Sequence, residues 1–170
     1  MVSDLDFKNV FGEDVKIVKY NELKEYKTFN DLLPSHDSFI IVLIESEYNS
    51  GHWCCLFRTK TDDIYWMDSY GVKPDGELKF IPERMRKLLG ENSNELQRLM
   101  KTIPKDKFHY FKERLQTMKD GVNTCGRWCM FFIKMCLFGF TMPEIVDFIK
   151  RKSKQHKKPS DILIIDWCPS

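Results

Sequence analysis

The chain has little of what marks disordered, fibrous or membrane-spanning proteins. Only 8 of its 170 residues are glycine and 7 are proline, while 42% are hydrophobic and 14% are aromatic. This composition excludes a low-complexity or collagen-like chain and predicts a substantial core. The longest nearly apolar run, 128–140, is interrupted by Lys134 and falls short of the roughly 20 residues that cross a bilayer, so we expect no membrane contact.

A charge excess and a secretory signal are also missing. The 27 Lys and Arg residues and the 25 Asp and Glu residues leave a net charge of +2, so any contact with nucleic acid must be local. Asp4, Asp6 and Lys8 stand where a secretory signal would need a basic start followed by an apolar run, so we expect the protein not to be secreted. The length predicts a single domain, 1–170.

The six cysteines do not form a metal or disulfide pattern. The chain has no C-x-x-C pair, Cys54 and Cys55 are adjacent, and Cys129 and Cys136 lie in an apolar stretch. Neighbouring strand residues point to opposite faces, which argues against a zinc site built on Cys54 and Cys55 together. We therefore predict reduced thiols in an intracellular protein and no metal site.

The order of periodic segments predicts a mixed α+β fold. The run 39–44 is short, branched and unbroken, as expected for a strand at the centre of a sheet. Segments 52–59 and 64–68 form an antiparallel hairpin across the polar turn 60–63. A further strand is expected over 15–20, and 108–116 fits a strand or a helix, of which the bounding Pro104 and Gly121 favour the strand. The expected helices are 21–33, two short ones within 81–100, a buried one over 125–140 and one opening at 141–144, with 162–167 as a docked tail.

Cys125 has the setting of a nucleophile. It stands directly before the apolar helix, and a helix N-terminus supplies partial positive charge and N–H groups that stabilise a thiolate. Gly126 leaves room for a substrate carbonyl, so the backbone N–H of Cys125 can donate to an oxyanion. A small buried cysteine is the plainer interpretation of this residue taken alone.

The predicted hairpin supplies a base and an acid. His52 begins one strand and Asp68 ends the next, so pairing brings them together at the open end, where the carboxylate can orient the imidazole. Gln116, at the end of the last expected strand, offers a side-chain amide as a second oxyanion donor. Gln97 is a competitor for that role, but it lies in a helical pattern.

The order His, Asp, Gln, Cys within GHW, DSYG and NTCG resembles the adenovirus-type and SUMO-protease-type cysteine peptidases. The chain is most similar to adenain-like maturation proteases of large DNA viruses, virophages and related transposons, over about 39–140. The resemblance implies a central mixed or antiparallel sheet packed against a buried helix that carries the nucleophile. It also implies the roles: Cys125 as nucleophile, His52 as general base and acid, Asp68 as its orienter and Gln116 in the oxyanion hole. The segment 117–124 is a few residues longer than is usual in the family.

The same resemblance indicates what the site would bind. Gly51, Trp53 and Gly126 are expected to line the substrate groove beside the dyad. Six cations in the last predicted long helix form either a solvated helix end or a contact for DNA, because the adenovirus protease uses DNA and a peptide as activators. These cations are Lys150, Arg151, Lys152, Lys154, Lys157 and Lys158.

The expected function is a monomeric cysteine endopeptidase that needs no cofactor and cleaves capsid or other virion precursor proteins during particle maturation. Small residues, often glycine, are expected before the cut. The expected location is the virion and the host-cell cytoplasm or viral factory. An isopeptidase that removes ubiquitin-like proteins would use the same groove. A non-catalytic binding module is the alternative from another class, which the intact Cys-His-Asp-Gln set disfavours.

Overall fold

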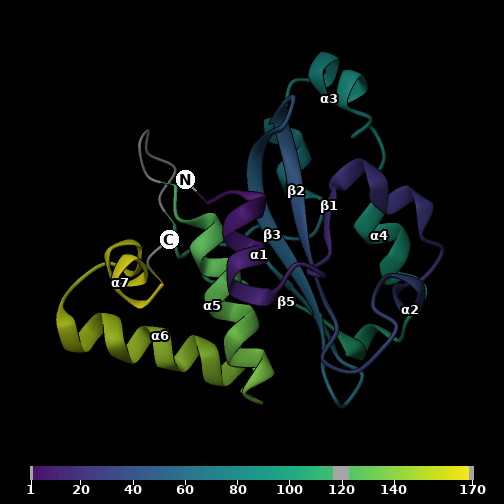
Figure 1. The fold of residues 1–170 in the computed structure, drawn as a ribbon. Coiled ribbons are helices and arrows are strands. Elements are labelled where there is room, and N and C mark those ends of the chain that lie inside the picture. Colours follow the sequence, from purple (N-terminus) through teal and green to yellow (C-terminus); the bar gives the residue numbers. More distant parts are fainter. Residues whose placement is uncertain (1, 117–122, 169–170) are drawn as a thin grey trace.

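The centre of the structure is a five-stranded mixed sheet whose strands lie side by side in chain order (Figure 1). The computed structural model describes residues 2–116 and 123–168. Strands β2, β3 and β4 are antiparallel neighbours, whereas the outer strands β1 and β5 run parallel to β2 and β4. The strands are β1 (Ile17–Lys19), β2 (Phe39–Glu47), β3 (Ser50–Arg58), β4 (Ile64–Met67) and β5 (Phe108–Tyr110). The predicted hairpin is confirmed, and the predicted strand 39–44 is the interior strand β2, although the middle of the sheet is β3.

Helices cover both faces of the sheet, which makes the chain one α+β domain (Figure 1). One face carries α1 (Asp4–Phe11), α5 (Cys125–Leu137), α6 (Met142–His156) and α7 (Ser160–Trp167). The other carries the 3₁₀ helix η1 (Tyr20–Glu25), α2 (Phe29–Leu32) and α4 (Glu95–Met100). The remaining elements are η2 (Gly76–Phe80), α3 (Glu83–Leu89) and η3 (Lys105–Lys107).

The sheet separates two apolar clusters, and alternation along β3 assigns its residues to them. Trp53 and Cys55 belong to the cluster under α5, whereas Cys54 belongs to the cluster on the face of η1, α2 and α4. This confirms that the two adjacent cysteines point to opposite faces. All six cysteines are free thiols.

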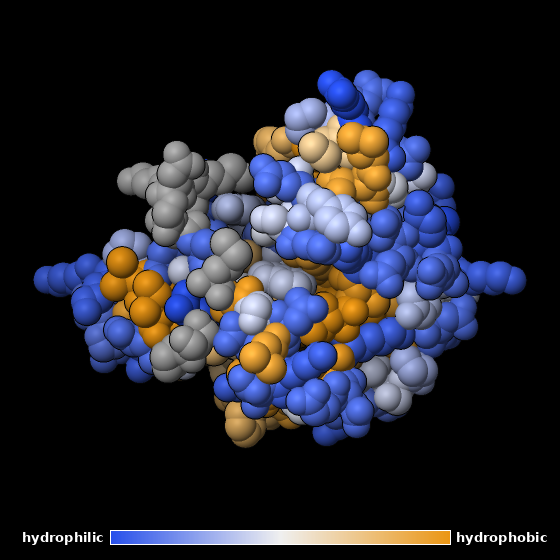
Figure 2. Space-filling view, turned by 45° about the horizontal axis from the view of Figure 1, so that its top comes forward, coloured by the Kyte–Doolittle hydropathy of each residue, from blue (hydrophilic) through white to orange (hydrophobic). Residues whose placement is uncertain are grey.

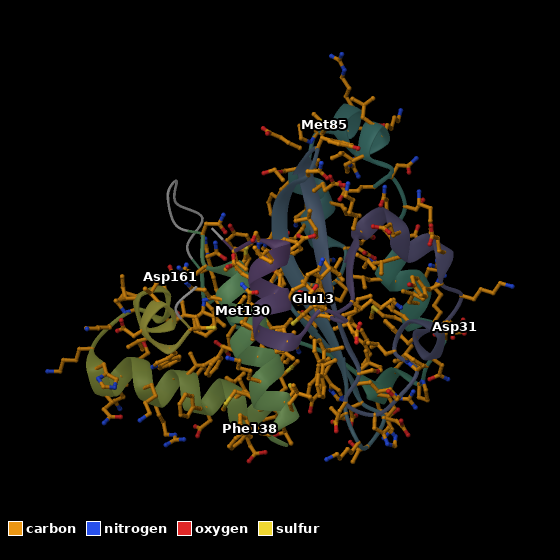
Figure 3. The ribbon with its side chains drawn as sticks, in the orientation of Figure 1. Glu13, Asp31, Met85, Met130, Phe138 and Asp161 are labelled. Carbon is orange, nitrogen blue, oxygen red and sulfur yellow. The ribbon has the colours of Figure 1, made fainter. Side chains whose placement is uncertain are left out.

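The predicted buried helix is α5, although it is shorter than the apolar run. Cys129 and Ile133 have no exposed surface, and this face packs against the sheet. The helix ends at Leu137, because Gly139 takes a positive φ of 95° that reverses the chain. Phe138 is 81% exposed and lies at the far end of α5 from the nucleophile (Figure 3).

The single helix predicted over 21–33 is wrong, since the structure has η1 and the short helix α2 in its place. The guanidinium of Arg98 donates to the carbonyl oxygens of Leu23 (2.9 Å) and Tyr26 (2.8 Å) at the end of η1, where the Leu23 carbonyl also accepts the Tyr26 N–H at 3.1 Å in a 3₁₀ bond. Thr28 then caps a new helix by accepting from the Asp31 N–H at 3.1 Å. Tertiary contacts from α4 therefore override the local pattern.

Three further boundaries differ from the sequence prediction. Strand β5 covers Phe108–Tyr110 only, because beyond Phe111 the chain leaves the β4 edge and the N–H groups of Leu115 and Gln116 donate to the Ser69 carbonyl instead. The docked tail is the helix α7, which buries Leu163 and Ile164. Helix α1 was not predicted from the sequence.

Apolar side chains also reach the surface. Figure 2 shows them around α3, where Leu88 is 73% exposed. No helix in the described part of the chain has both the length and the apolarity needed to cross a membrane.

Gly51 allows the close approach of β2 and β3 directly before His52. A Cβ atom at this position would lie 2.0 Å from the main-chain oxygen of Ile44. We expect Gly51→Ala to lower the free energy of unfolding by about 2–3 kcal/mol, because the two strands must separate to admit the methyl group. Gly139→Ala is the matched control, since a Cβ there meets nothing within 4 Å. Its cost is the strain of an alanine held at a positive φ, about 1 kcal/mol of the free energy of unfolding. If urea unfolding shows the same loss of unfolding free energy for Gly51→Ala and Gly139→Ala, the steric argument is contradicted.

Candidate active site

The β3–β4 hairpin places His52 against Asp68, as the sequence predicted. The Nε2 atom of His52 lies 2.8 Å from Oδ1 of Asp68. The same oxygen accepts the main-chain N–H of Tyr70 at 2.8 Å, which fixes the carboxylate. The Tyr70 ring stacks on the imidazole with centroids 4.5 Å apart, so the ring of His52 is held in both position and plane.

Cys125 is the first residue of α5 and sits beside this pair. Strand β4 ends at Met67, which pairs with Cys55. Trp53 lies two residues before Cys55, beyond the end of β4, so its N–H has no partner from β4. It donates instead to the Sγ atom of Cys125 at 3.4 Å. The Cys125 thiol also lies within hydrogen-bonding reach of the His52 imidazole. The end of a strand thus creates the space for the thiol and supplies one of its donors.

Two further contacts hold the start of α5 in place, and the sequence did not reveal them. The Cys125 thiol donates to Oδ1 of Asn123 at 3.2 Å. The hydroxyl of Thr124 donates to Oδ1 of Asp161 on α7 at 3.2 Å. Figure 3 shows Asp161 on α7, beside the N-terminal half of α5. The C-terminal helix α7 therefore supports Thr124, the residue directly before Cys125.

The charges around the imidazole favour its protonated form. Burial opposes a charge on His52, but its neighbours, among them the hydrogen-bonded carboxylate of Asp68, outweigh it and raise the pKa of His52 well above its usual range. Burial alone would raise the pKa of Asp68, yet hydrogen bonds with Glu77 and His52 lower it. The pair is thus suited to hold an imidazolium next to a carboxylate.

Glu77 is a second buried acid in this site and was not predicted. It lies on η2, with Oε1 3.3 Å from His52 Nε2. Burial raises the pKa of Glu77 well above its usual range, so the protonated carboxyl can donate to Asp68. The sequence holds no signal for this contact, because an acid after Asp75-Gly76 looks like an ordinary surface turn.

The side chains of His52, Cys54, Asp68 and Glu77 are the described residues that could hold a metal ion. One ligand atom from each of the four lies within 4.8 Å of all the others. Thiolate, imidazole and carboxylate are the ligand types of zinc. The sequence prediction of no metal site weighed Cys54, Cys55, Cys125, Cys129 and His52 as zinc ligands. It could not foresee the convergence of His52 and Cys54 with two acids from other segments.

Gln116 lies next to the acid rather than free in solvent. It is buried, and its Oε1 atom accepts the hydroxyl of Ser69 at 2.8 Å, while Asp68 directly precedes Ser69. This contact makes Nε2 of Gln116 the donor end of the amide. Its competitor Gln97 is exposed on α4, whose buried residues pack on the other face of the sheet from α5. Part of the connecting segment, 117–122, lies outside the described residues.

The three residues expected to contact substrate all have packing roles in the structure. Gly51 permits the strand approach described above. Trp53 is buried, packs edge-on against Phe7 with centroids 5.0 Å apart, and donates through Nε1 to the Val2 carbonyl at 3.0 Å. A Cβ at Gly126 would lie 2.5 Å from the Cβ of Val2. Their contact with a substrate stays a prediction.

The six cations of the basic cluster lie on the second half of α6 and just beyond it, and half of them have partners within the chain. Lys150 pairs with Glu113 at 3.1 Å and Arg151 with Asp147 at 3.0 Å. The Lys152 ammonium lies 5.7 Å from the ring centroid of Phe148. DNA binding by this cluster stays a prediction.

Comparison with known proteins gives one clear relative. The chain is 29% identical over 163 residues to the uncharacterized protein V9 of Sputnik virophage. The aligned region covers 96% of this chain and 91% of the virophage protein. This similarity suggests a viral origin. The central domain of the uncharacterized Lpg1148 protein from Legionella pneumophila is 14% identical, covering 88% of this chain and 86% of that one, at a TM-score of 0.35. No family profile matches the chain.

Proposed function

We propose that this chain is a cysteine endopeptidase that cleaves viral precursor proteins during particle maturation. The observation that supports it is the convergence of three elements: a helix N-terminus carrying Cys125, a strand carrying His52, and a carboxylate of Asp68 held 2.8 Å from the imidazole. Acyl transfer needs this combination of nucleophile, base and orienter. The virophage relative supports the viral part of the proposal.

The proposed reaction has two steps. His52 takes the proton of the Cys125 thiol, and the thiolate attacks the peptide carbonyl carbon to form a tetrahedral intermediate. The oxyanion is stabilised by the Cys125 N–H and the Gln116 amide. The imidazolium then donates its proton to the leaving amine, and the C–N bond breaks to leave a thioester. Water, deprotonated by His52, hydrolyses the thioester and restores the thiol.

The test is co-expression with candidate virion precursor proteins, followed by mapping of new N-termini by mass spectrometry. Cleavage behind small residues, absent with Cys125→Ala, would support the proposal. Labelling by an electrophilic probe built on a ubiquitin-like protein, without cleavage of any precursor, would assign an isopeptidase instead. Binding of precursor proteins without any cleavage or labelling would contradict both enzymatic functions.

Gln116 is expected to contribute about 10²-fold to turnover, the scale of one oxyanion donor. We expect Gln116→Ala to lower kcat by that factor with little change in KM, because the donor acts on charge that develops in the transition state. Gln97→Ala is the control and should leave the kinetics of peptide cleavage unchanged. If the loss appears with Gln97→Ala instead, the oxyanion donor has been assigned to the wrong glutamine.

A further inference from the structure

Four side chains from three separate segments converge at the contact between His52 and Asp68. His52 and Cys54 are two apart on β3, Asp68 follows β4, and Glu77 lies on η2. Their ligand atoms are mutually within 4.8 Å. Residues two apart on a strand share a face, so this register necessarily puts a thiol beside the catalytic imidazole.

The cluster is nearly closed to solvent. Cys54 has no exposed surface, and the side chains of Asp68, Glu77 and His52 are 1%, 10% and 12% exposed. Such a concentration of acidic groups without solvent is costly unless a cation or a proton neutralises it.

Two oxygens in the cluster also lack ordinary donors. Apart from the proton that the two carboxyl groups share, no group among the described residues donates to Oδ2 of Asp68 or Oε1 of Glu77 in hydrogen-bonding geometry. The proposed reaction assigns no role to the Cys54 thiol. The buried acceptors and the unused thiol face the same small volume, where a cation would satisfy all of them.

We propose that His52, Cys54, Asp68 and Glu77 form a zinc site that switches the catalytic dyad off. Tetrahedral zinc with bonds of about 2.0–2.3 Å places its ligands about 3.3–3.8 Å apart, so the observed set closes around an ion with shifts of about 1 Å. The thiol and imidazole exclude Mg²⁺ and Ca²⁺, which take oxygen ligands. The ion binds as Zn²⁺ while the Cys54 thiol loses its proton.

The consequence for catalysis rests on the proposed function. When zinc occupies one nitrogen of the His52 ring, the other nitrogen carries the only ring proton and cannot accept one from Cys125. Asp68 at the same time becomes a ligand and no longer orients the base. A zinc-loaded protein is therefore inactive, and a chelator restores it.

The binding test does not depend on activity. Cobalt(II) is the probe, because a thiolate ligand gives it a near-ultraviolet charge-transfer band and a tetrahedral site gives strong visible bands. We expect these bands in Cys125→Ala, with zinc displacing the cobalt. Adding Cys54→Ser in that background should remove the charge-transfer band. It should also weaken zinc binding by more than about 100-fold, because losing a residue that only supports a metal ligand already costs about 10–100-fold. Adding Cys55→Ser, the buried neighbour on the opposite face, should change neither.

Three outcomes would overturn the proposal. One is the absence of zinc binding at micromolar concentrations to a folded protein. Another is loss of the cobalt spectrum in Cys125→Ala, which would place the ion on the Cys125–His52 pair. The last is unchanged affinity in Cys54→Ser. If Cys54→Ser destabilises the fold, Cys54→Ala repeats the comparison without a buried hydroxyl.

A measurement of peptide cleavage tests whether zinc at this site regulates the enzyme. Zinc should inhibit peptide cleavage by the unmodified chain and by Cys55→Ser at the affinity measured by displacement, and inhibition of Cys54→Ser should need more than about 100-fold more zinc. Zinc binding at this site in a chain with no peptidase activity would refute the proposed function alone. Cleavage that saturating zinc leaves unaffected would refute the switch.

Discussion

Replacing Cys125 with alanine is expected to reduce peptide cleavage by about 10⁵–10⁶-fold, because no other group can form the thioester. The fold should remain, since the side chain loses one sulfur atom, which is hydrogen-bonded to the Trp53 N–H and to Asn123. We expect the free energy of unfolding to change by less than about 1 kcal/mol. Steady-state cleavage and urea unfolding of the same preparation measure the two effects.

Cys129→Ala is the matched control for this variant. Cys129 lies one helical turn further along α5 and is fully buried, and burial raises the pKa of its thiol well above the usual range. Its replacement should keep turnover within about 2-fold while leaving a small cavity. A haloacetamide should label Cys125 before Cys129, Cys136 or Cys54, whose pKa values are also raised by burial. Equal labelling rates would remove the case for an activated thiolate.

The dyad could be predicted from the sequence because strand pairing alone determines it. The turn 60–63 sets the register, and Met67 pairs with Cys55, so Asp68 comes opposite Cys54. His52 lies two residues before Cys54 on the same face of β3, which brings the His52 and Asp68 side chains together where the hairpin opens. The helix after Cys125 was equally predictable, since no strand accommodates so long an apolar run. Short-range rules were sufficient for both.

The rest of the site depends on contacts between distant segments. Glu77 reaches the imidazole only because η2 folds back over the end of β4, and Asp161 reaches Thr124 only because α7 docks beside α5. Neither approach has a local sequence signal. Helix α1 and its neighbour Val2, which cover Trp53 and Gly126, are likewise set by packing. The same holds for Arg98, which ends the helix expected over 21–33.

Replacing Asp68 with alanine is expected to lower kcat/KM by about 10³–10⁴-fold. Without the carboxylate, the proton on Nε2 keeps only the longer contact of 3.3 Å with Glu77, so the ring can present an N–H rather than a lone pair to the thiol. The imidazolium also loses the counter-charge that lies 2.8 Å away. Asp63→Ala is the control, because Asp63 pairs with His109 at 2.9 Å in a similar His–Asp contact away from the dyad, and turnover should not change.

Asp68→Asn separates the two contributions of the carboxylate. The Tyr70 N–H donates to Oδ1, so it selects the carbonyl end of the new amide at that position and keeps an acceptor against His52 Nε2. The productive tautomer should survive while the negative charge is lost, which predicts a loss of about 10–10²-fold, smaller than for alanine. Equal losses for the two variants would show that charge rather than orientation dominates. Full activity in Asp68→Ala would assign the orienting role to Glu77, whose Oε1 is 3.3 Å from the same nitrogen, and Asp68→Ala with Glu77→Ala would then abolish turnover.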